Sequence, residues 1–420
     1  MKKIPASIKR LLLQIKNQGF YAYLVGKCLE YELIGREADY WTIITNASEA
    51  ALKKTDLIVD EGNKNNSDNW IYSLEYKQKD NSKITWRIFI KRQDNSAEAF
   101  FEDKLFTVDS VGYDGENYYD PYEGKEDIKN EVIDLVYMPQ EYLEQHPEDL
   151  LTIVEKIAET GYDLSQELFS VLISKGGILT SQDKKTLTEK FQNIMTGEFT
   201  GKALKVMDET GMLAFLVGER LYKNRNKKER EAFQKYIQNI DRTKRILDRR
   251  IVSFYLGFWK KKDMRAMDNL DYDDDLKEKL RFAHQHLSDL YYLHKPTDLK
   301  DYLYKYGLKM YNFVDNISKI QARVYGLKTD GIGRRHMILQ KIALENEPVF
   351  LEDLSMNAET LMKEGLAKDQ QEADSLLDLL VYIVHRHPDY NEPHLLLSQV
   401  YRLNKNPLKK YRYKYLTKKL

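Results

Sequence analysis

The first 50 residues alternate twice between helical and strand spacing. Apolar side chains recur every three or four positions at Ile8, Leu11, Leu12 and Ile15. This spacing predicts a helix with one buried face, which ends by Gly19. The apolar run 21–25 then predicts a short buried strand that ends at Gly26.

A second helix and strand are predicted directly afterwards. The apolar helix face consists of Cys28, Leu29, Leu33 and Ile34. Gly35 marks its end, because glycine is common just past a helix C-terminus. The apolar run 41–44 predicts the second strand, and 46–49 carries polar residues typical of a helix start.

Beyond Met138-Pro139 the spacing is almost entirely helical, with glycines and prolines between amphipathic stretches. Residues 181–184 predict one helix start. The acidic run 271–275 predicts another, since it lacks the spaced oxygens and the glycine of a calcium loop. The buried face of the first helix consists of Leu151, Ile153, Val154, Ile157 and Ala158.

Composition narrows the class of protein. The 420 residues suffice for several domains, and 66 basic side chains balance 66 acidic ones. Zero net charge argues against a globally basic nucleic-acid-binding protein but permits a local basic face. The single cysteine, Cys28, excludes an intramolecular disulfide and is typical of the reducing cytoplasm. No apolar run reaches the roughly 18 residues of a membrane span, and the N-terminus lacks a signal-peptide core, so we expect no membrane association.

Three histidines, His284, His286 and His294, lie close together in the sequence. A pair two residues apart points to different faces of a helix. We therefore expect no metal site at these histidines.

The stretch from Tyr23 to Thr45 resembles the head of class II CCA-adding enzymes and bacterial poly(A) polymerases, the tRNA nucleotidyltransferases. In that family a strand and Gly-Gly turn lead to Val-Arg-Asp, then Leu-Leu-Gly-Arg, then an Asp-x-Asp pair on the next strand. The apolar and glycine frame is present here, including Gly35-Arg36 and Thr45. The resemblance implies an α+β fold. A polymerase-β-like mixed-sheet nucleotidyltransferase head at 1–137 would precede an all-α neck at 138–213, body at 214–335 and tail at 336–420.

The family's chemistry uses carboxylates to hold two metal ions beside a nucleoside triphosphate. Aligned on Gly35-Arg36 and Thr45, the two aspartate positions fall on Tyr40 and Thr42. Asp39 lies one residue too early, and in a strand this offset points it to the opposite face. The run 84–90 matches the strand of the third carboxylate and contains no acidic residue.

Other charged positions of the family are also replaced. Gly-Gly becomes Gly26-Lys27, and Val-Arg-Asp becomes Leu29-Glu30-Tyr31. The family's Arg-Arg-Asp-Phe-Thr-Ile-Asn-Ala aligns with 103–110, which keeps Phe106 and Thr107 but has Asp109 at the asparagine. The following segment, 119–130, resembles the family pattern best of all. We expect its residues to have a structural rather than a catalytic role.

The family reads the incoming base with a Glu-Asp-x-x-Arg helix. Here Glu148 and Asp149 are kept, but Thr152 stands at the arginine. An aspartate alone cannot complete a two-point pairing that distinguishes bases. Templating by the family mechanism is therefore not expected.

The C-terminal stretch 408–420 interleaves cations with aromatic residues, which suits phosphate neutralisation and base stacking. A docked edge strand or a disordered basic tail would show the same alternation. The predicted RNA-binding residues are Lys409, Lys410, Tyr411, Arg412, Tyr413 and Lys414.

Three possible functions follow from the resemblance. The favoured one is a catalytically impaired relative that binds RNA such as tRNA, or acts as a regulatory protein, without a cofactor. The alternative is an active nucleotidyltransferase that adds CMP or AMP to RNA 3′ ends with Mg²⁺, using Asp39, Glu37 or Glu30 as ligands in an altered register. A third function is ATP or CTP binding without turnover, through Gly26, Lys27, Asp149 and Thr152.

Overall fold

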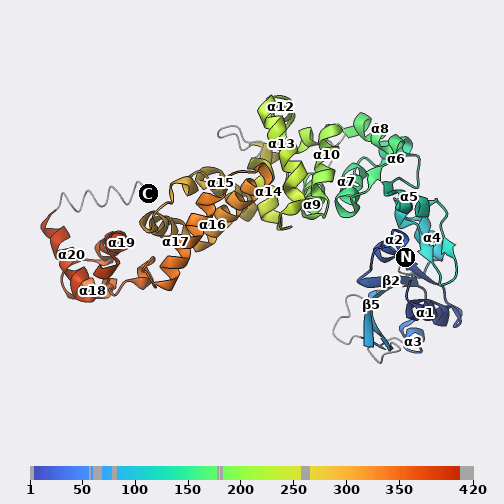
Figure 1. Ribbon diagram of the computed structural model, residues 1–420, viewed down its shortest axis with the longest axis horizontal. Coiled ribbons are helices and arrows are strands. Elements are labelled where there is room, and N and C mark those ends of the chain that lie inside the picture. The colour runs from blue at the N-terminus through green and yellow to red at the C-terminus, as the bar shows by residue number, and fades with distance from the viewer. Residues whose placement is uncertain are drawn as a thin grey trace. The chain divides into compact units, whose positions relative to one another are not determined.

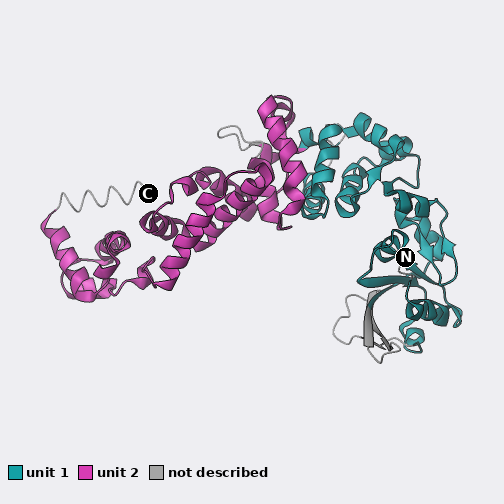
Figure 2. Cartoon of the chain, in the orientation of Figure 1, with its two compact units in different colours: residues 1–215 teal, residues 216–420 magenta. Residues whose placement is uncertain are grey.

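The chain divides into two compact units, residues 1–215 and 216–420 (Figure 2). The computed structural model describes residues 4–55, 58–59, 69–77, 83–176, 179, 183–256 and 265–406. The change of unit falls two residues after the predicted end of the neck. The finer division at 137, 213 and 335 stays a prediction.

A mixed sheet organises the first unit (Figure 1). In the described residues it has seven strands in the order β3-β4-β5-β2-β1-β6-β7. Strands β2 and β5 run parallel, and the other neighbours are antiparallel. The strands are β1 (Ala22–Val25), β2 (Tyr40–Thr45), β3 (Ile58–Val59), β4 (Asn69–Lys77), β5 (Lys83–Arg92), β6 (Gly112–Tyr113) and β7 (Tyr118–Tyr119). The predicted mixed-sheet head is confirmed.

The first two helices lie where the apolar spacing predicts them. Helix α1 (Ala6–Lys16) buries Ile8, Leu11, Leu12 and Ile15. Helix α2 (Lys27–Leu33) buries Cys28 and Leu29. Gly26, between β1 and α2, has a φ of 74°, a left-handed conformation that glycine adopts without a steric penalty. Further short helices are α3 (Glu49–Leu52), α4 (Ala97–Glu102), η1 (Thr107–Asp109) and α5 (Gly124–Asn130).

The best-preserved segment of the sequence forms a hairpin and turn that close against η1. Thr107 donates its hydroxyl hydrogen to Asp127 at 2.6 Å. Gly124 packs so closely on η1 that a Cβ there would lie 2.0 Å from the Thr107 carbonyl oxygen. The preserved residues of this segment are therefore explained by packing.

The rest of the first unit is helical. Its helices are α6 (Pro139–Gln145), α7 (Asp149–Thr160), α8 (Gln166–Lys175), α9 (Lys184–Thr196) and α10 (Thr200–Glu209). The predicted apolar face of α7 is buried, and Asp183 caps α9; Ser181 and Gln182 lie outside the described residues. A two-stranded parallel sheet of β8 (Val132–Ile133) and β9 (Asp163–Leu164) interrupts the helical pattern. Two-residue strands such as these are too short to show an alternation in the sequence.

The second unit is helical throughout its described residues. Its helices are α11 (Leu213–Val217, which starts in the first unit), α12 (Glu219–Lys223), α13 (Lys227–Asn239), η3 (Ile240–Arg242), α14 (Leu247–Leu256), η4 (Arg265–Asn269), α15 (Asp274–His286), η5 (Asp289–Tyr292), α16 (Pro296–Tyr325), α17 (Asp330–Leu344), η6 (Leu351–Asp353), α18 (Ala358–Lys363), α19 (Gln370–Arg386), η7 (Pro388–Tyr390) and α20 (Pro393–Lys405). Asp273 caps α15, which confirms the helix start predicted at 271–275. Gly307 breaks α16 into two helical segments, with φ 77° and ψ 158°.

Buried ion pairs connect the long helices of this unit. Arg335 of α17 donates to Asp315 of α16 at 2.7 Å and 3.0 Å. Asp301 receives Arg386 at 2.6 Å and lies 2.7 Å from His385 Nδ1. Among the described helices, each is too short or too polar to cross a lipid bilayer.

Gly124→Ala is expected to destabilise the protein by about 2 kcal/mol or more, because the added Cβ overlaps the Thr107 backbone. Chemical denaturation measures the change. Gly333→Ala in α17 is the matched control, since nothing lies within 4 Å of its Cβ position and alanine favours the helix. Equal stability of the two variants would contradict the packing explanation.

Candidate functional site

Tyr40 and Thr42 share one face of β2, because side chains two residues apart point the same way. Tyr40 is 39% exposed, and its ring packs edge-on against Phe89 at 5.3 Å between centroids. Trp41 and Ile43, on the other face, are buried. Tyr40 and Thr42, which the resemblance aligns with the family's aspartates, therefore lie on the more exposed face of the strand.

Strand β5 completes this face. Its parallel register places Arg87 beside Tyr40 and Phe89 beside Thr42. The strand predicted to match the third carboxylate is thus the direct neighbour of β2. The four side chains on the shared face are a phenol, a hydroxyl, a guanidinium and a phenyl ring.

This set of side chains does not fit a pair of Mg²⁺ ions, which require several carboxylate oxygens. In the part of the chain that the structure describes, no group of three His, Cys, Asp or Glu side chains is placed to hold a metal. Asp39 is exposed and lies one residue before β2. Asp39, Glu37 and Glu30 are therefore not brought together as a three-ligand site.

Thr45, which the resemblance aligns with a threonine of the family, makes a structural contact. Its hydroxyl donates to the Tyr21 carbonyl oxygen at 2.5 Å and accepts from the Ala47 amide at 3.1 Å. The side chain is fully buried. It fixes the end of β2 against the start of β1 independently of any catalysis.

A buried group of charges lies where α2, η1 and α7 meet. Lys156 of α7 donates to Asp109 at 2.7 Å, and its ammonium lies 3.9 Å from both Glu30 and Glu159. Lys156 is 8% exposed and Glu30 5%. We call Glu30, Asp109, Lys156 and Glu159 the Lys156 cluster.

The Lys156 cluster contains two positions at which the sequence departs from the pattern it resembles. The resemblance aligns Glu30 with a family arginine and Asp109 with a family asparagine, so on that alignment both positions gain negative charge. Lys156 supplies the compensating cation. No sequence motif pointed to Lys156. The acidic residues Glu30 and Asp109 could have indicated it, because buried carboxylates require a nearby cation.

Electrostatics within the cluster are strongly perturbed. Burial raises the pKa of the Glu30 carboxyl to about 7, although the Lys156 ammonium acts in the opposite direction. Burial alone would lower the pKa of Lys156, but attraction to Asp109, Glu30 and Glu159 outweighs it and raises that pKa. Lys156 is therefore a permanent cation, whereas Glu30 titrates near neutrality.

Gly26 and Lys27, the predicted nucleotide-binding residues of the head, lie at the start of α2. The Lys27 ammonium is 4.0 Å from Glu159 and 5.6 Å from the centre of the Tyr31 ring. A carboxylate and an aromatic ring thus already contact the ammonium that a phosphate would use.

Asp149 and Thr152, the predicted base-reading residues, form a closed hydrogen-bonded group with neighbouring side chains. Asp149 accepts from the Tyr142 hydroxyl at 2.8 Å and from Thr152 at 2.9 Å. Lys190 of α9 donates to the Thr152 hydroxyl at 2.5 Å. Both carboxylate oxygens of Asp149 are therefore engaged within the protein.

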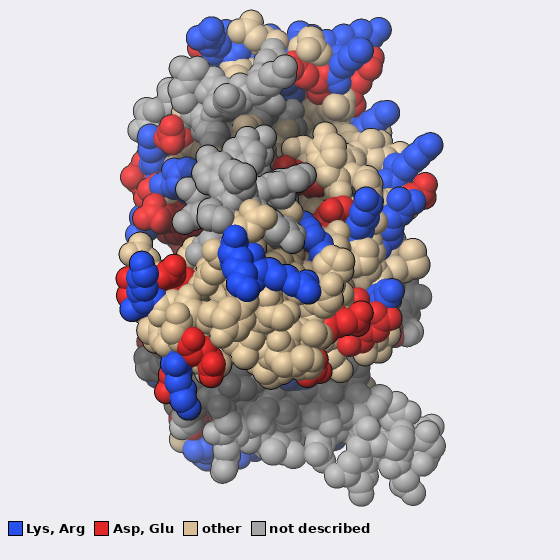
Figure 3. Space-filling view, turned by 90° about the vertical axis from the view of Figure 1, so that its left-hand side faces the viewer, with Lys and Arg blue, Asp and Glu red and all other residues tan. Residues whose placement is uncertain are grey.

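The remaining predicted site residues, Lys409 to Lys414, lie outside the described residues. On the face in Figure 3, the described Lys and Arg side chains are interspersed with Asp and Glu around a broad uncharged area. This mixture agrees with the zero net charge of the sequence.

Lys156→Met is expected to destabilise the protein by about 3 kcal/mol at pH 8, because it leaves Glu30 and Asp109 without their shared cation. Urea denaturation measures the change. Lys185→Met, at an exposed position of α9, is the control and should have little effect. A loss below about 1 kcal/mol for Lys156→Met would show that the cluster is not a stabilising contact.

Glu30→Gln is expected to flatten the pH dependence of stability between about pH 4.5 and 7. An acid with a raised folded pKa binds its proton more tightly when folded. Its stabilising contribution is therefore full below the ordinary value of 4.5 and is lost as the pH rises through about 7. The wild-type free energy of unfolding should fall over this window by up to about 3 kcal/mol from this group. Glu189→Gln, at an exposed position of α9 outside the cluster, should keep the wild-type slope; an unchanged slope in Glu30→Gln would refute the assignment.

Comparisons with known proteins agree on one group of enzymes, although no family model matches the chain. The CCA-adding enzyme of Geobacillus kaustophilus is 23% identical over 220 residues, which cover 50% of this chain and 54% of that protein. The CCA-adding enzyme of Geobacillus sp. strain WCH70 is 22% identical over 219 residues, covering 49% and 53%. The chain thus spans about half the length of the curated relatives it matches.

Solved structures extend the likeness over nearly the whole chain. The Bacillus stearothermophilus CCA-adding enzyme in complex with CTP superposes with a TM-score of 0.71 at 15% identity, covering 96% of this chain and 98% of that one. The Thermotoga maritima CCA-adding enzyme complexed with tRNA gives a TM-score of 0.57 at 15% identity, covering 96% of both chains. At this identity the structures establish a common fold. Together, the comparisons show that this chain has the fold of CCA-adding enzymes and is distantly similar to them in sequence.

Proposed function

We propose that this protein is a tRNA nucleotidyltransferase relative that binds tRNA-like RNA but does not transfer nucleotides by the two-metal route. The observation that carries the proposal is the face shared by β2 and β5. Tyr40, Thr42, Arg87 and Phe89 stand there in register, and none of them is a carboxylate. Without hard oxygen ligands, the metals that activate the RNA 3′ hydroxyl and neutralise pyrophosphate have no site there.

The Lys156 cluster supports the same proposal. A nucleotide bound between the sheet and α7 would bring its phosphate charges towards a region that already contains three carboxylates around one ammonium. Lys27, the cation at the start of α2, faces Glu159. Like-charge repulsion at this place disfavours triphosphate binding in the ancestral position.

The proposed partner follows from relatives of the same fold. One such structure is a CCA-adding enzyme complexed with tRNA, and others are complexes with CTP and with ATP. We propose tRNA as the main partner of this chain, with a regulatory role in the cytoplasm. ATP or CTP binding through Gly26, Lys27, Asp149 and Thr152 is the weaker part of the proposal, because Lys27 and Asp149 already have protein partners.

Labelled CTP and ATP, offered with Mg²⁺ and a tRNA that lacks its 3′ CCA, should not be incorporated above the level of a reaction without protein. The physical reason is the missing carboxylate set on β2 and β5. An active CCA-adding enzyme on the same RNA is the positive control. The same RNA should bind in a fluorescence anisotropy titration, with an affinity that falls as salt rises.

Mg²⁺-dependent incorporation by the pure protein would overturn the loss of catalysis. In that event Asp39→Ala decides the alternative of a shifted carboxylate set. Loss of the activity in Asp39→Ala, with retention in Asp94→Ala, would assign the catalytic metal to the altered register.

A further inference from the structure

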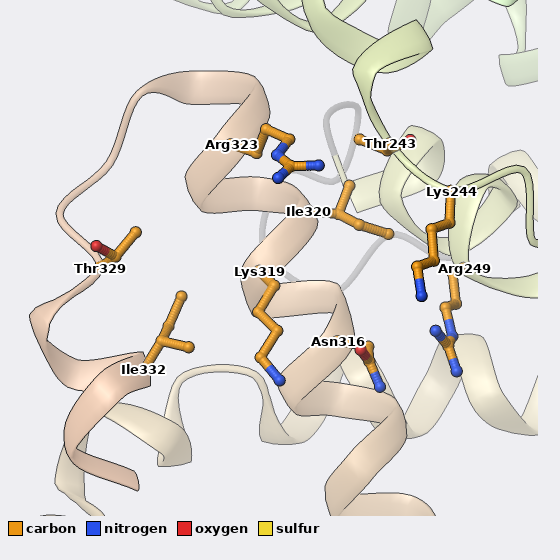
Figure 4. Close-up of a pocket in the computed structure, with 9 residues that line it drawn as sticks. All are labelled: Thr243, Lys244, Arg249, Asn316, Lys319, Ile320, Arg323, Thr329 and Ile332. Carbon is orange, nitrogen blue, oxygen red and sulfur yellow. The ribbon is translucent and has the colours of Figure 1, made fainter. Parts of the chain in front are cut away.

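A basic pocket lies within the second unit (Figure 4). Its volume is about 440 Å³, within the range of roughly 300–1,000 Å³ typical of small-ligand sites. The lining residues are Thr243, Lys244, Arg249, Asn316, Lys319, Ile320, Arg323, Thr329 and Ile332. Four of these nine side chains are cations, and none is acidic.

The cations come from separate elements and meet across the pocket. Figure 4 shows Lys244, in the loop before α14, and Arg249 of α14 opposite Lys319 and Arg323 of α16. Lys319 pairs with Asp315 at 2.8 Å. Within the described residues, Lys244, Arg249 and Arg323 have no acidic partner in an ion pair. The pocket thus holds an excess of positive charge in a chain whose net charge is zero.

The wall that carries Lys244 is held in place by a buried arginine. Arg250, fully buried, donates to the carbonyl oxygens of Thr243 at 2.9 Å and Ile240 at 3.4 Å. Arg323 donates to the Arg242 carbonyl oxygen at 2.8 Å, which joins α16 to the same turn. The two sides of the pocket are therefore connected before any ligand binds, which reduces the ordering cost of binding.

Two further features suit an anion with an attached apolar group. Thr329 is the N-cap of α17, so the positive end of a helix dipole lies at the pocket wall. Ile320 and Ile332 add apolar surface beside the cations. A phosphate next to a sugar or base has this combination of charge and apolar surface.

We infer that this pocket binds clustered phosphate groups, carried either by an RNA backbone or by a free nucleoside polyphosphate. Arginine and lysine at fixed positions neutralise phosphate oxygens, and their release of counterions makes such binding dependent on salt. If RNA is the source, the inference rests on the proposed function and assigns the contact to α14 and α16. If a free nucleotide is the source, the pocket is a separate ligand site.

The test is the double variant Lys244→Glu, Arg249→Glu in the full-length chain. The probes are ATP and inorganic pyrophosphate by calorimetry, and tRNA lacking its 3′ CCA by anisotropy. The affinity for the probe that uses the pocket should fall about tenfold or more. For RNA, the slope of log affinity against log salt should also decrease by about 2.

The matched control is Lys228→Glu, Lys235→Glu on α13, which makes the same change of charge at two exposed positions of the same unit. This control should change affinity less than about threefold. If the pocket variant loses helical signal, the milder Lys244→Gln replaces it, with the same expected direction.

Each outcome decides the inference. A selective loss of RNA affinity identifies the backbone as the source, and a selective loss of ATP or pyrophosphate affinity identifies a free ligand. An ATP affinity that falls with Lys27→Ala instead, equal effects of pocket and control variants, or no binding of any probe would overturn the pocket assignment. Nucleotide incorporation is measured separately from binding, so nucleotide transfer can be found or excluded without affecting this result.

Discussion

The first unit depends on one buried ammonium. Lys156 of α7 lies between carboxylates from α2 and η1, elements that precede it by many residues and belong to the sheet-containing part of the unit. A buried cation with three acidic neighbours fixes the helix relative to the sheet, because moving it away would leave buried charges without a partner. The position of α7, and with it the helices α9 and α10 packed on it, therefore depends on this interaction.

The same interaction bears on the proposed loss of nucleotidyl transfer. Glu30 and Asp109 bring negative charge from the protein itself, and Lys156 offsets only part of it. This charge arrangement is consistent with the proposed loss of metal ligands at Tyr40 and Thr42. Without bound metal ions, the carboxylates around Lys156 would repel a triphosphate.

The structural part of the family pattern is retained for reasons unrelated to catalysis. Gly124 is required by its contact with Thr107, and Thr45 joins two strands. Such contacts contribute to folding whether or not a nucleotide binds. The fold is shared by structures at 15% identity. The side chains on the exposed face of β2 can be replaced with little effect on the core. The basic pocket of the second unit depends on neither.

The sequence by itself determined the local elements and the identity of the side chains at the motif positions. Apolar spacing placed α1, α2, β1 and β2, since a helix or strand face is set by residues a few positions apart. The absence of acidic residues on β5 was also evident from the sequence alone. Only the tertiary structure identified Lys156 and the basic pocket, because their partners are distant in the chain: Lys156 and Asp109 are 47 residues apart, and the pocket joins α14 to α16. Charge neutralisation and pocket formation depend on which side chains meet in space, and local spacing does not encode that.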